Sequence, residues 1–123
     1  MTENMELLDR LTPRFKLWLE LDGVTILGRG GALLLRSIEE HGSISQALRS
    51  LSAEELGAAD PPSYRFAWGY LQKVEERLGA AIVEKRRGHR AGAGGTALTA
   101  LGRTLLKRFE ELENKLTASL RED

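Results

Sequence analysis

The most constraining feature of this chain is the order of sequence patterns between Gly42 and Arg87. A short stretch with helical character, G-S-I-S-Q-A-L-R-S-L, leads into a connection that contains Asp60-Pro61-Pro62, where a helix is forbidden. A longer helical pattern then runs from Ser63 to about Leu78, and a short apolar strand follows it into a basic cluster that begins at Lys85. This order leaves few ways to fold 123 residues, a length that normally forms one domain around one core.

The flanking sequence assigns the rest of the chain. Residues 4–11 place Met5, Leu8 and Leu11 on one side of a helix, which Pro13 ends. Apolar and polar residues then alternate around Asp22-Gly23, which is a strong hairpin signal. We therefore expect one domain over residues 1–123, mainly α with small β elements, in four parts: an N-terminal helix (1–13), a hairpin (14–28), a core (32–98) and a C-terminal helix (99–121).

Glycines and polar caps mark the helix ends expected inside the core. The glycine-rich residues 28–31 are interpreted as a breaker, and they lack the sequence of a phosphate-binding loop. A helix is expected from Ala32 to His41 and ends at Gly42. Ser43 is expected to cap the next helix, with Gln46 as its capping-box partner.

The longer helical pattern that begins at Ser63 has two faces. Apolar residues at helical spacing are expected to face the core: Ala67, Leu71, Val74 and Leu78. Polar residues and a glycine share the opposite face: Arg65, Gly69, Gln72 and Glu76. A glycine inside a helix costs roughly 1 kcal/mol, which a close backbone approach at Gly69 would explain. Core packing is expected for Phe66 and Tyr70, and packing and contact both stay open for Trp68.

Charge is unevenly distributed along a chain whose net charge is zero. Residues 63–108 hold ten lysines and arginines and three acids, so this segment carries +7 and the remaining residues carry −7. Screening limits the reach of distant charges to about 8–10 Å, so a local basic face decides whether phosphates are attracted. The alternative is that these cations only solvate helix faces.

Helix order and charge together point to double-stranded DNA as the partner. A major groove about 12 Å wide admits an α-helix, and side chains near its N-terminus reach base edges. Arginine and glutamine pair with guanine and adenine, whereas hydroxyls and cations contact the phosphate backbone. The residues expected to contact DNA lie in three elements: Ser43, Ser45 and Gln46 in the short helix, Ser63, Tyr64, Arg65, Trp68, Gly69, Gln72 and Lys73 in the longer helix, and Lys85, Arg86, Arg87 and Arg90 in the basic hairpin.

The last helix carries a heptad seam. Its apolar residues repeat at spacings of four, three and four: Leu105, Phe109, Leu112 and Leu116. A seam of this kind can pack on its own domain. This one continues past the region needed for a small core, so we favour a homodimer contact.

Other function classes have little support in the sequence. The chain has no cysteine, which removes disulfides and thiolate metal sites and fits the cytoplasm. No apolar run approaches the roughly 18 residues that span a bilayer, and no secretory signal opens the chain. His41 and His89 lie 48 residues apart without a nucleophile, base or metal-ligand pattern. We therefore expect no enzymatic activity, cofactor, metal or small-molecule site.

Several strings resemble one family of regulators: G-S-I-S-Q-A at 42–47, S-Y-R-F-A-W at 63–68, E-E-R-L-G at 75–79, I-V-E-K-R-R at 82–87, the glycine-rich residues 92–95 and A-L-T-A-L-G at 97–102. They are similar to the N-terminal DNA-binding domain of the molybdate-responsive ModE-type regulators, relatives of the LysR-type proteins, over about residues 14–112. The resemblance implies a winged helix-turn-helix fold and a dimeric transcription regulator.

Two departures from that family pattern stand out. Family members join the two helices by a short turn, whereas residues 51–62 form an insert here, which leaves the angle between the helices open. ModE proteins also carry C-terminal oxyanion-binding domains, and this chain ends at Asp123, so no ligand-sensing domain of its own is expected. The alternative function is a protein–protein interaction module that reuses the fold, because a fold does not fix a function.

Overall fold

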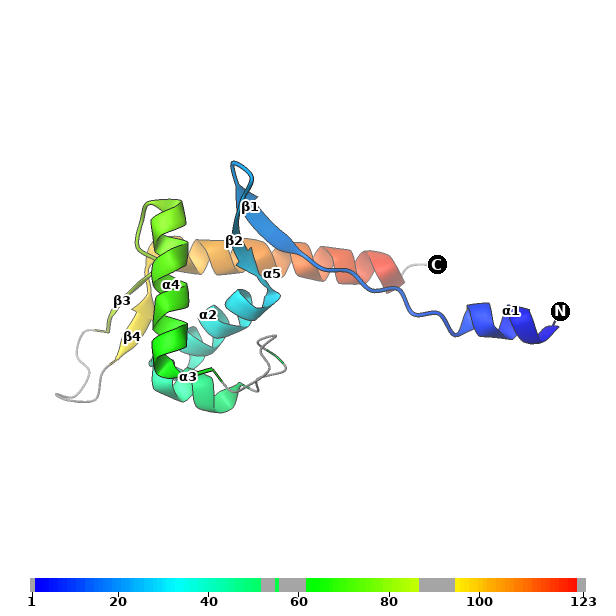
Figure 1. Ribbon diagram of the computed structural model, residues 1–123, viewed down its shortest axis with the longest axis horizontal. Coiled ribbons are helices and arrows are strands. Elements are labelled where there is room, and N and C mark those ends of the chain that lie inside the picture. The colour runs from blue at the N-terminus through cyan, green and yellow to red at the C-terminus, as the bar shows by residue number, and fades with distance from the viewer. Residues whose placement is uncertain (1, 52–54, 56–61, 87–94, 122–123) are drawn as a thin grey trace.

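The computed structural model describes residues 2–51, 55, 62–86 and 95–121. In this part of the chain the elements are α1 (Thr2–Asp9), β1 (Trp18–Leu21), β2 (Val24–Gly28), α2 (Arg29–His41), α3 (Ile44–Ser50), α4 (Tyr64–Leu78), β3 (Val83–Lys85), β4 (Thr96–Leu98) and α5 (Ala100–Arg121). The protein is mainly helical, with one hairpin before the core, a small second hairpin and a long last helix, as the sequence predicts (Figure 1). None of the described helices is long and apolar enough to cross a membrane.

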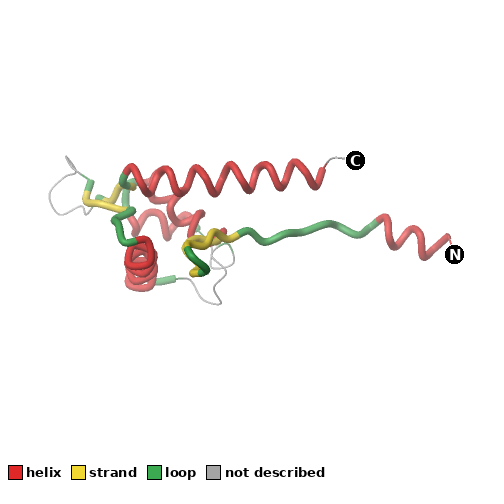
Figure 2. The backbone as a smooth tube through the Cα atoms, turned by 90° about the horizontal axis from the view of Figure 1, so that it is seen from above, coloured by secondary structure: helices red, strands yellow, loops and turns green. Residues whose placement is uncertain are grey.

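The core lies around α2, which contacts α3, α5, β2 and β4. Figure 2 shows the same arrangement from above, with α5 running away from this centre. The largest fully buried side chains come from all of these elements, from α4 and from the residue before β3: Phe109, Leu27, Leu35, Ile38, Ile44, Leu71, Ile82, Leu98, Leu106 and Val74. The apolar stripes of separate helices are therefore buried against one another in a single cluster.

The helix ends follow the predicted caps. Gly42 and Gly79 take left-handed conformations, with φ of 77° and 75°, and end α2 and α4. Ser43 and Ser63 begin α3 and α4, and each hydroxyl accepts a hydrogen bond of 3.1 Å from the backbone N–H three residues on. The sequence-based assignment of these helix boundaries is confirmed.

The first hairpin turns at Asp22-Gly23, as predicted. Both residues have positive φ, 51° and 84°, which matches the twist that two-residue hairpin turns require. β1 and β2 pair antiparallel, with a register shift between Leu19 and Glu20. The pairing begins at Trp18 rather than at residue 14, because its partner strand ends at Gly28 and α2 begins at the next residue.

The interpretation of residues 28–31 as a breaker is wrong beyond Gly28. Arg29 begins α2, so the two following glycines lie within the helix. At Gly31 a Cβ atom would lie 1.9 Å from the Tyr70 hydroxyl and 2.8 Å from Leu27 Cδ1. The glycine is therefore explained by the close approach of the Tyr70 side chain to α2, a contact that no local pattern announces.

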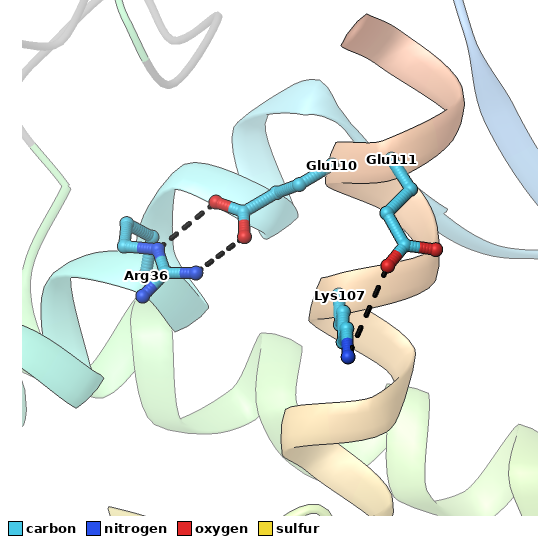
Figure 3. A network of polar contacts seen from close by, with 4 residues as sticks. All are labelled: Arg36, Lys107, Glu110 and Glu111. Carbon is cyan, nitrogen blue, oxygen red and sulfur yellow. Dashed lines mark hydrogen bonds and ion pairs between the residues drawn. The ribbon is translucent and has the colours of Figure 1, made fainter. Parts of the chain in front are cut away.

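The long α5 is joined to α2 by charge as well as by packing (Figure 3). Arg36 Nε donates to a Glu110 carboxylate oxygen at 2.9 Å, and Nη2 contacts the other oxygen. This hydrogen bonding raises the pKa of the Arg36 guanidinium. Lys107 and Glu111 form a looser pair at 4.0 Å on the outer side of α5, where solvent screens it. The Arg36–Glu110 pair thus fixes how α5 lies on the core.

Candidate nucleic-acid interface

The predicted recognition helix, α4, has one buried and one exposed face. Ala67, Leu71 and Val74 are buried, which holds the helix in the core. Arg65 and Gln72 are exposed on the opposite side. Because residues four apart share a helix face, the apolar stripe itself dictates that these polar side chains point outward. The two-faced prediction for this helix is confirmed.

Gly69 lies in the middle of the exposed face. A Cβ atom there would meet nothing within 4 Å, so no group in the described part of the chain approaches it. A glycine in the interior of a helix costs roughly 1 kcal/mol relative to alanine. This cost has no explanation within the described part of the chain, and the surface at Gly69 is open to a partner.

Aromatic residues near the start of α4 are unusually exposed. Tyr64 is 54% exposed, Phe66 63% and Trp68 41%. The expected packing of Phe66 in the core is wrong, because one residue turns a helix by about 100° and so carries position 66 away from the buried stripe at Ala67. Phe66 is therefore an exposed aromatic side chain that sequence reasoning missed.

Tyr70 packs as predicted. It is partly buried against the hydrophobic core, with its hydroxyl over Gly31. Burial raises the pKa of the Tyr70 phenol, and the positive charge of Arg77 acts in the opposite direction. Arg77 in turn donates to the Thr25 carbonyl at 2.9 Å. Tyr70 and Arg77 thus orient α4 relative to α2 and the first hairpin.

The short helix α3 packs across α4. Ala47 is fully buried, and its small side chain permits a close approach between helices. Ser37 donates to the Ala47 carbonyl at 3.2 Å, which ties α3 back to α2. Of the predicted contacts in α3, Ser43 is buried at 8% exposure, whereas Ser45 and Gln46 are exposed.

The second hairpin is held at the C-terminal end of α4 by Glu75. Its Oε2 accepts hydrogen bonds from the backbone N–H groups of Ile82 at 2.7 Å and Val83 at 3.2 Å. A carboxylate that accepts from two backbone donors forms charge-assisted bonds. Sequence reasoning missed this role. Its only sequence signal is an acid one turn before the helix-ending Gly79, next to an apolar strand.

A second set of contacts joins the hairpin to the start of α3. Thr96 N–H donates to the Gly42 carbonyl at 2.9 Å, and Arg86 N–H donates to the Gly95 carbonyl at 3.2 Å. A Cβ atom on Gly42 would lie 2.1 Å from Arg86 Nη1, so the guanidinium lies directly over this glycine. The hairpin therefore carries an exposed cation to the junction of α2 and α3.

The predicted contacts thus gather on three neighbouring elements. Lys73 and Lys85 are exposed on α4 and β3. Arg87 and Arg90, which the sequence places beyond β3, lie outside the described residues, as do most of the residues between α3 and α4. No group of three acids or histidines in the described ranges is arranged to hold a metal ion.

The predicted dimer seam divides along its length. Phe109 is 1% exposed and packs in the core of its own chain, with Leu105 partly buried beside it. Leu112 and Leu116 are each 41% exposed. The first half of the seam is therefore used inside the chain, and the second half is left on the surface.

Comparison with known proteins gives one relative. The chain is 32% identical over 80 residues to the transcriptional regulator ModE of Haemophilus influenzae. The chain is a distant homologue of ModE. The matched region makes up 65% of this chain and 28% of ModE, so the chain spans a little over a quarter of its relative's length. No family model matches the chain.

The homology to ModE bears on function class. ModE is a transcriptional regulator, and the chain is related to a little over a quarter of it.

Proposed function

We propose that this chain is a dimeric, sequence-specific double-stranded DNA-binding protein of winged helix-turn-helix type that regulates transcription in the cytoplasm. The observation that carries the proposal is the outer face of α4. Arg65, Gly69 and Gln72 lie exposed on this face, while the opposite face is fixed in the core. Distant homology to a transcriptional regulator supports the same function.

In this proposal α4 enters the major groove. Arg65 recognises guanine through O6 and N7, and Gln72 recognises adenine through N6 and N7. Gly69 lies between them on the same face, where the absence of a side chain lets the DNA come close to the helix backbone. Trp68, which is 41% exposed, makes an apolar contact at the edge of this face.

Backbone contacts surround the base-reading face. Hydroxyls and cations at the ends of α3 and α4 and in the second hairpin contact phosphate and fix the register of the protein on DNA. The groups proposed for this role are Ser45, Gln46, Ser63, Tyr64, Lys73, Lys85, Arg86, Arg87 and Arg90. Ser43 is buried, so its part is to cap α3 and direct the N–H groups of that helix outward.

The homodimer forms through the outer half of α5. Leu112 and Leu116 are exposed, and apolar side chains repeated on one helix face bury themselves against a second helix. Phe109 and Leu105 support this surface from within the chain. Two copies related by a two-fold axis would present two α4 helices to two half-sites.

A salt-dependent binding titration tests the proposal. Fluorescence anisotropy on random and upstream genomic duplexes should show binding at about 50 mM salt, where phosphate contacts are strongest. The logarithm of the binding constant should fall linearly with the logarithm of salt, by about 0.9 for each phosphate contacted. No binding at about 50 mM salt would refute DNA binding.

Arg65→Ala tests the base-reading role directly. Loss of a bidentate contact should weaken specific binding by about 1–3 kcal/mol and relax the preference at one base pair, with little change on random DNA. The matched control is Arg65→Lys, which keeps the positive charge and removes the planar guanidinium that makes a bidentate contact. Equal losses on specific and random duplexes would assign Arg65 to phosphate instead.

The exposed aromatic side chains favour one alternative function, a protein–protein interaction module. Tyr64, Phe66 and Trp68 are of the residue types enriched at protein interfaces. Under this alternative, a partner captured from the source lysate would remain bound at high salt, and Arg86→Ala combined with Arg87→Ala would leave the capture unchanged. Capture that depends on these arginines and is lost on nuclease treatment supports DNA instead.

A further inference from the structure

The N-terminal helix α1 lies apart from the rest of the chain. Figures 1 and 2 both show it beyond the C-terminal end of α5, at the end of an extended segment without regular structure. The apolar side chains of this region are exposed: Met5 by 61%, Leu7 by 52%, Leu8 by 58% and Leu11 by 72%. A helix of eight residues is marginal in water without tertiary packing. The helix therefore needs a surface that the described part of its own chain does not supply.

The segment after α1 forms one wall of an open groove. Its other walls are the start of α2 and the last turns of α5, and among the lining residues are Arg14, Phe15, Trp18, Thr117 and Leu120. Phe15 is 38% exposed, Trp18 52% and Leu120 42%. The segment after α1 and the last turns of α5 thus both present apolar side chains to the groove. Leu112 and Leu116 of α5 are exposed as well.

A two-fold symmetric dimer would place a second α5 helix at this groove. Leu112, Leu116 and Leu120 are spaced by four residues and exposed to the same degree, at 41%, 41% and 42%. A two-fold axis at Leu116 would place two α5 helices antiparallel, with Leu112 of one copy opposite Leu120 of the other. Each copy then supplies both a groove and a helix to fill its partner's groove.

The charge order of the N-terminal arm, residues 2–18, matches that of α5. Residues 2–9 carry three acids and no base, and residues 10–16 carry three bases and no acid. In α5, residues 100–108 carry three bases and no acid, and residues 110–113 carry three acids and no base. An arm aligned parallel to such a helix can therefore place its acidic part beside residues 100–108 and its basic part beside residues 110–113, whereas Lys115 and Arg121 farther along α5 do not add to this match.

The direction of the arm fits that alignment. The arm runs from beyond the end of α5 back toward the core, whereas α5 runs from the core outward (Figure 1). The arm is therefore antiparallel to its own α5 and parallel to an antiparallel partner's α5. Acidic α1 then lies beside the basic first half of the partner's helix, and the basic residues 10–16 lie beside its acidic middle.

We propose that the N-terminal arm of each chain wraps around α5 of a second copy, so that the two chains exchange arms. This inference rests on the homodimer proposed above and adds its second contact surface. The partner's α5 fills the groove beside residues 12–18, and α1 covers exposed Leu101 and the basic residues near the start of that helix. The helix α1 then gains its tertiary packing only when the dimer forms.

Charge reversal in two separate chains tests the exchange. One variant carries Glu6→Lys and Asp9→Lys in the arm, and the other carries Lys107→Glu and Arg108→Glu in α5. Each variant alone turns attraction into repulsion at both arm–helix contacts, so its dimer dissociation constant should rise about tenfold or more at low salt. In an equimolar mixture, the heterodimer pairs reversed arm with reversed helix and native arm with native helix, so affinity should return to nearly that of the unmodified chain.

Analytical ultracentrifugation of the full chain, with one variant fluorescently labelled, measures both constants. Glu39→Lys with Glu40→Lys on the exposed end of α2 is the control for added positive charge and should leave dimerisation unchanged. Weak dimers that the mixture fails to rescue would place the arm on its own α5 and overturn the exchange, as would variants that dimerise normally alone. An unmodified chain that is monomeric at all concentrations would refute the homodimer. DNA binding is tested separately by the salt titration, so the two failures can be told apart.

Discussion

At the scale of single residues, two glycines inside helices differ in the space around the position of a Cβ atom. A Cβ atom on Gly102 of α5 would lie 2.2 Å from the Ile82 carbonyl oxygen, a backbone atom that cannot move without moving β3. A Cβ atom on Gly69 of α4 would meet nothing within 4 Å. The same residue type is thus required by packing in one helix and left open to a partner in the other.

The two glycines therefore predict changes in stability of opposite sign. Gly102→Ala should lower the free energy of unfolding by about 1–3 kcal/mol through overpacking. Gly69→Ala should raise it by roughly 0.5–1 kcal/mol, because alanine restricts the unfolded chain and suits a helix. Urea denaturation followed by circular dichroism measures both. A loss of stability in Gly69→Ala would mean that an unseen contact fills that space.

At the scale of elements, the attachment of the second hairpin to α4 depends on Glu75. Its carboxylate accepts from two backbone N–H groups, those of Ile82 and Val83. Glu75→Gln keeps the shape and removes the charge, so we expect a loss of about 1–2 kcal/mol and faster amide exchange at both donors. Its exposed neighbour provides the control, because Glu76→Gln should leave both quantities unchanged. Unaltered exchange at Ile82 in Glu75→Gln would mean that the strand is held by packing alone.

Local sequence signals were sufficient to predict the helices and strands. The features that the sequence did not predict depend on contacts between residues far apart in the chain. Asp22-Gly23 and the serine caps announce the hairpin and the helix starts because their chemistry is local. Position 31 of α2 is a glycine because Tyr70, far along the chain, approaches it too closely for a Cβ atom. The Glu75 contacts likewise join an acid to a strand across a turn. Of the site, the exposed face of α4 was predictable from its periodicity, whereas the anchoring of the hairpin was not.

At the scale of the whole molecule, two-fold symmetry connects the dimer to the DNA that it would select. Two chains joined through the outer half of α5 carry two α4 helices, so selection from a random duplex pool should yield a palindrome with half-sites separated by about one helical turn or a multiple of it. Leu112→Asp with Leu116→Asp places charge on the proposed interface. Both side chains are 41% exposed, so the fold should persist, and circular dichroism checks this.

The doubly substituted chain should then select a single half-site with lower affinity, because only one α4 contacts each duplex and the linked second binding event is lost. Phe109→Ala is a comparison variant that distinguishes loss of the dimer interface from loss of core packing. Phe109 is 1% exposed, so its truncation should cost about 3–5 kcal/mol of stability, unlike the change at the two leucines. The symmetry of a DNA site mirrors the symmetry of the protein that binds it. If a folded Leu112→Asp, Leu116→Asp chain still selects a palindrome, the two-fold axis of the dimer must therefore lie elsewhere on the molecule.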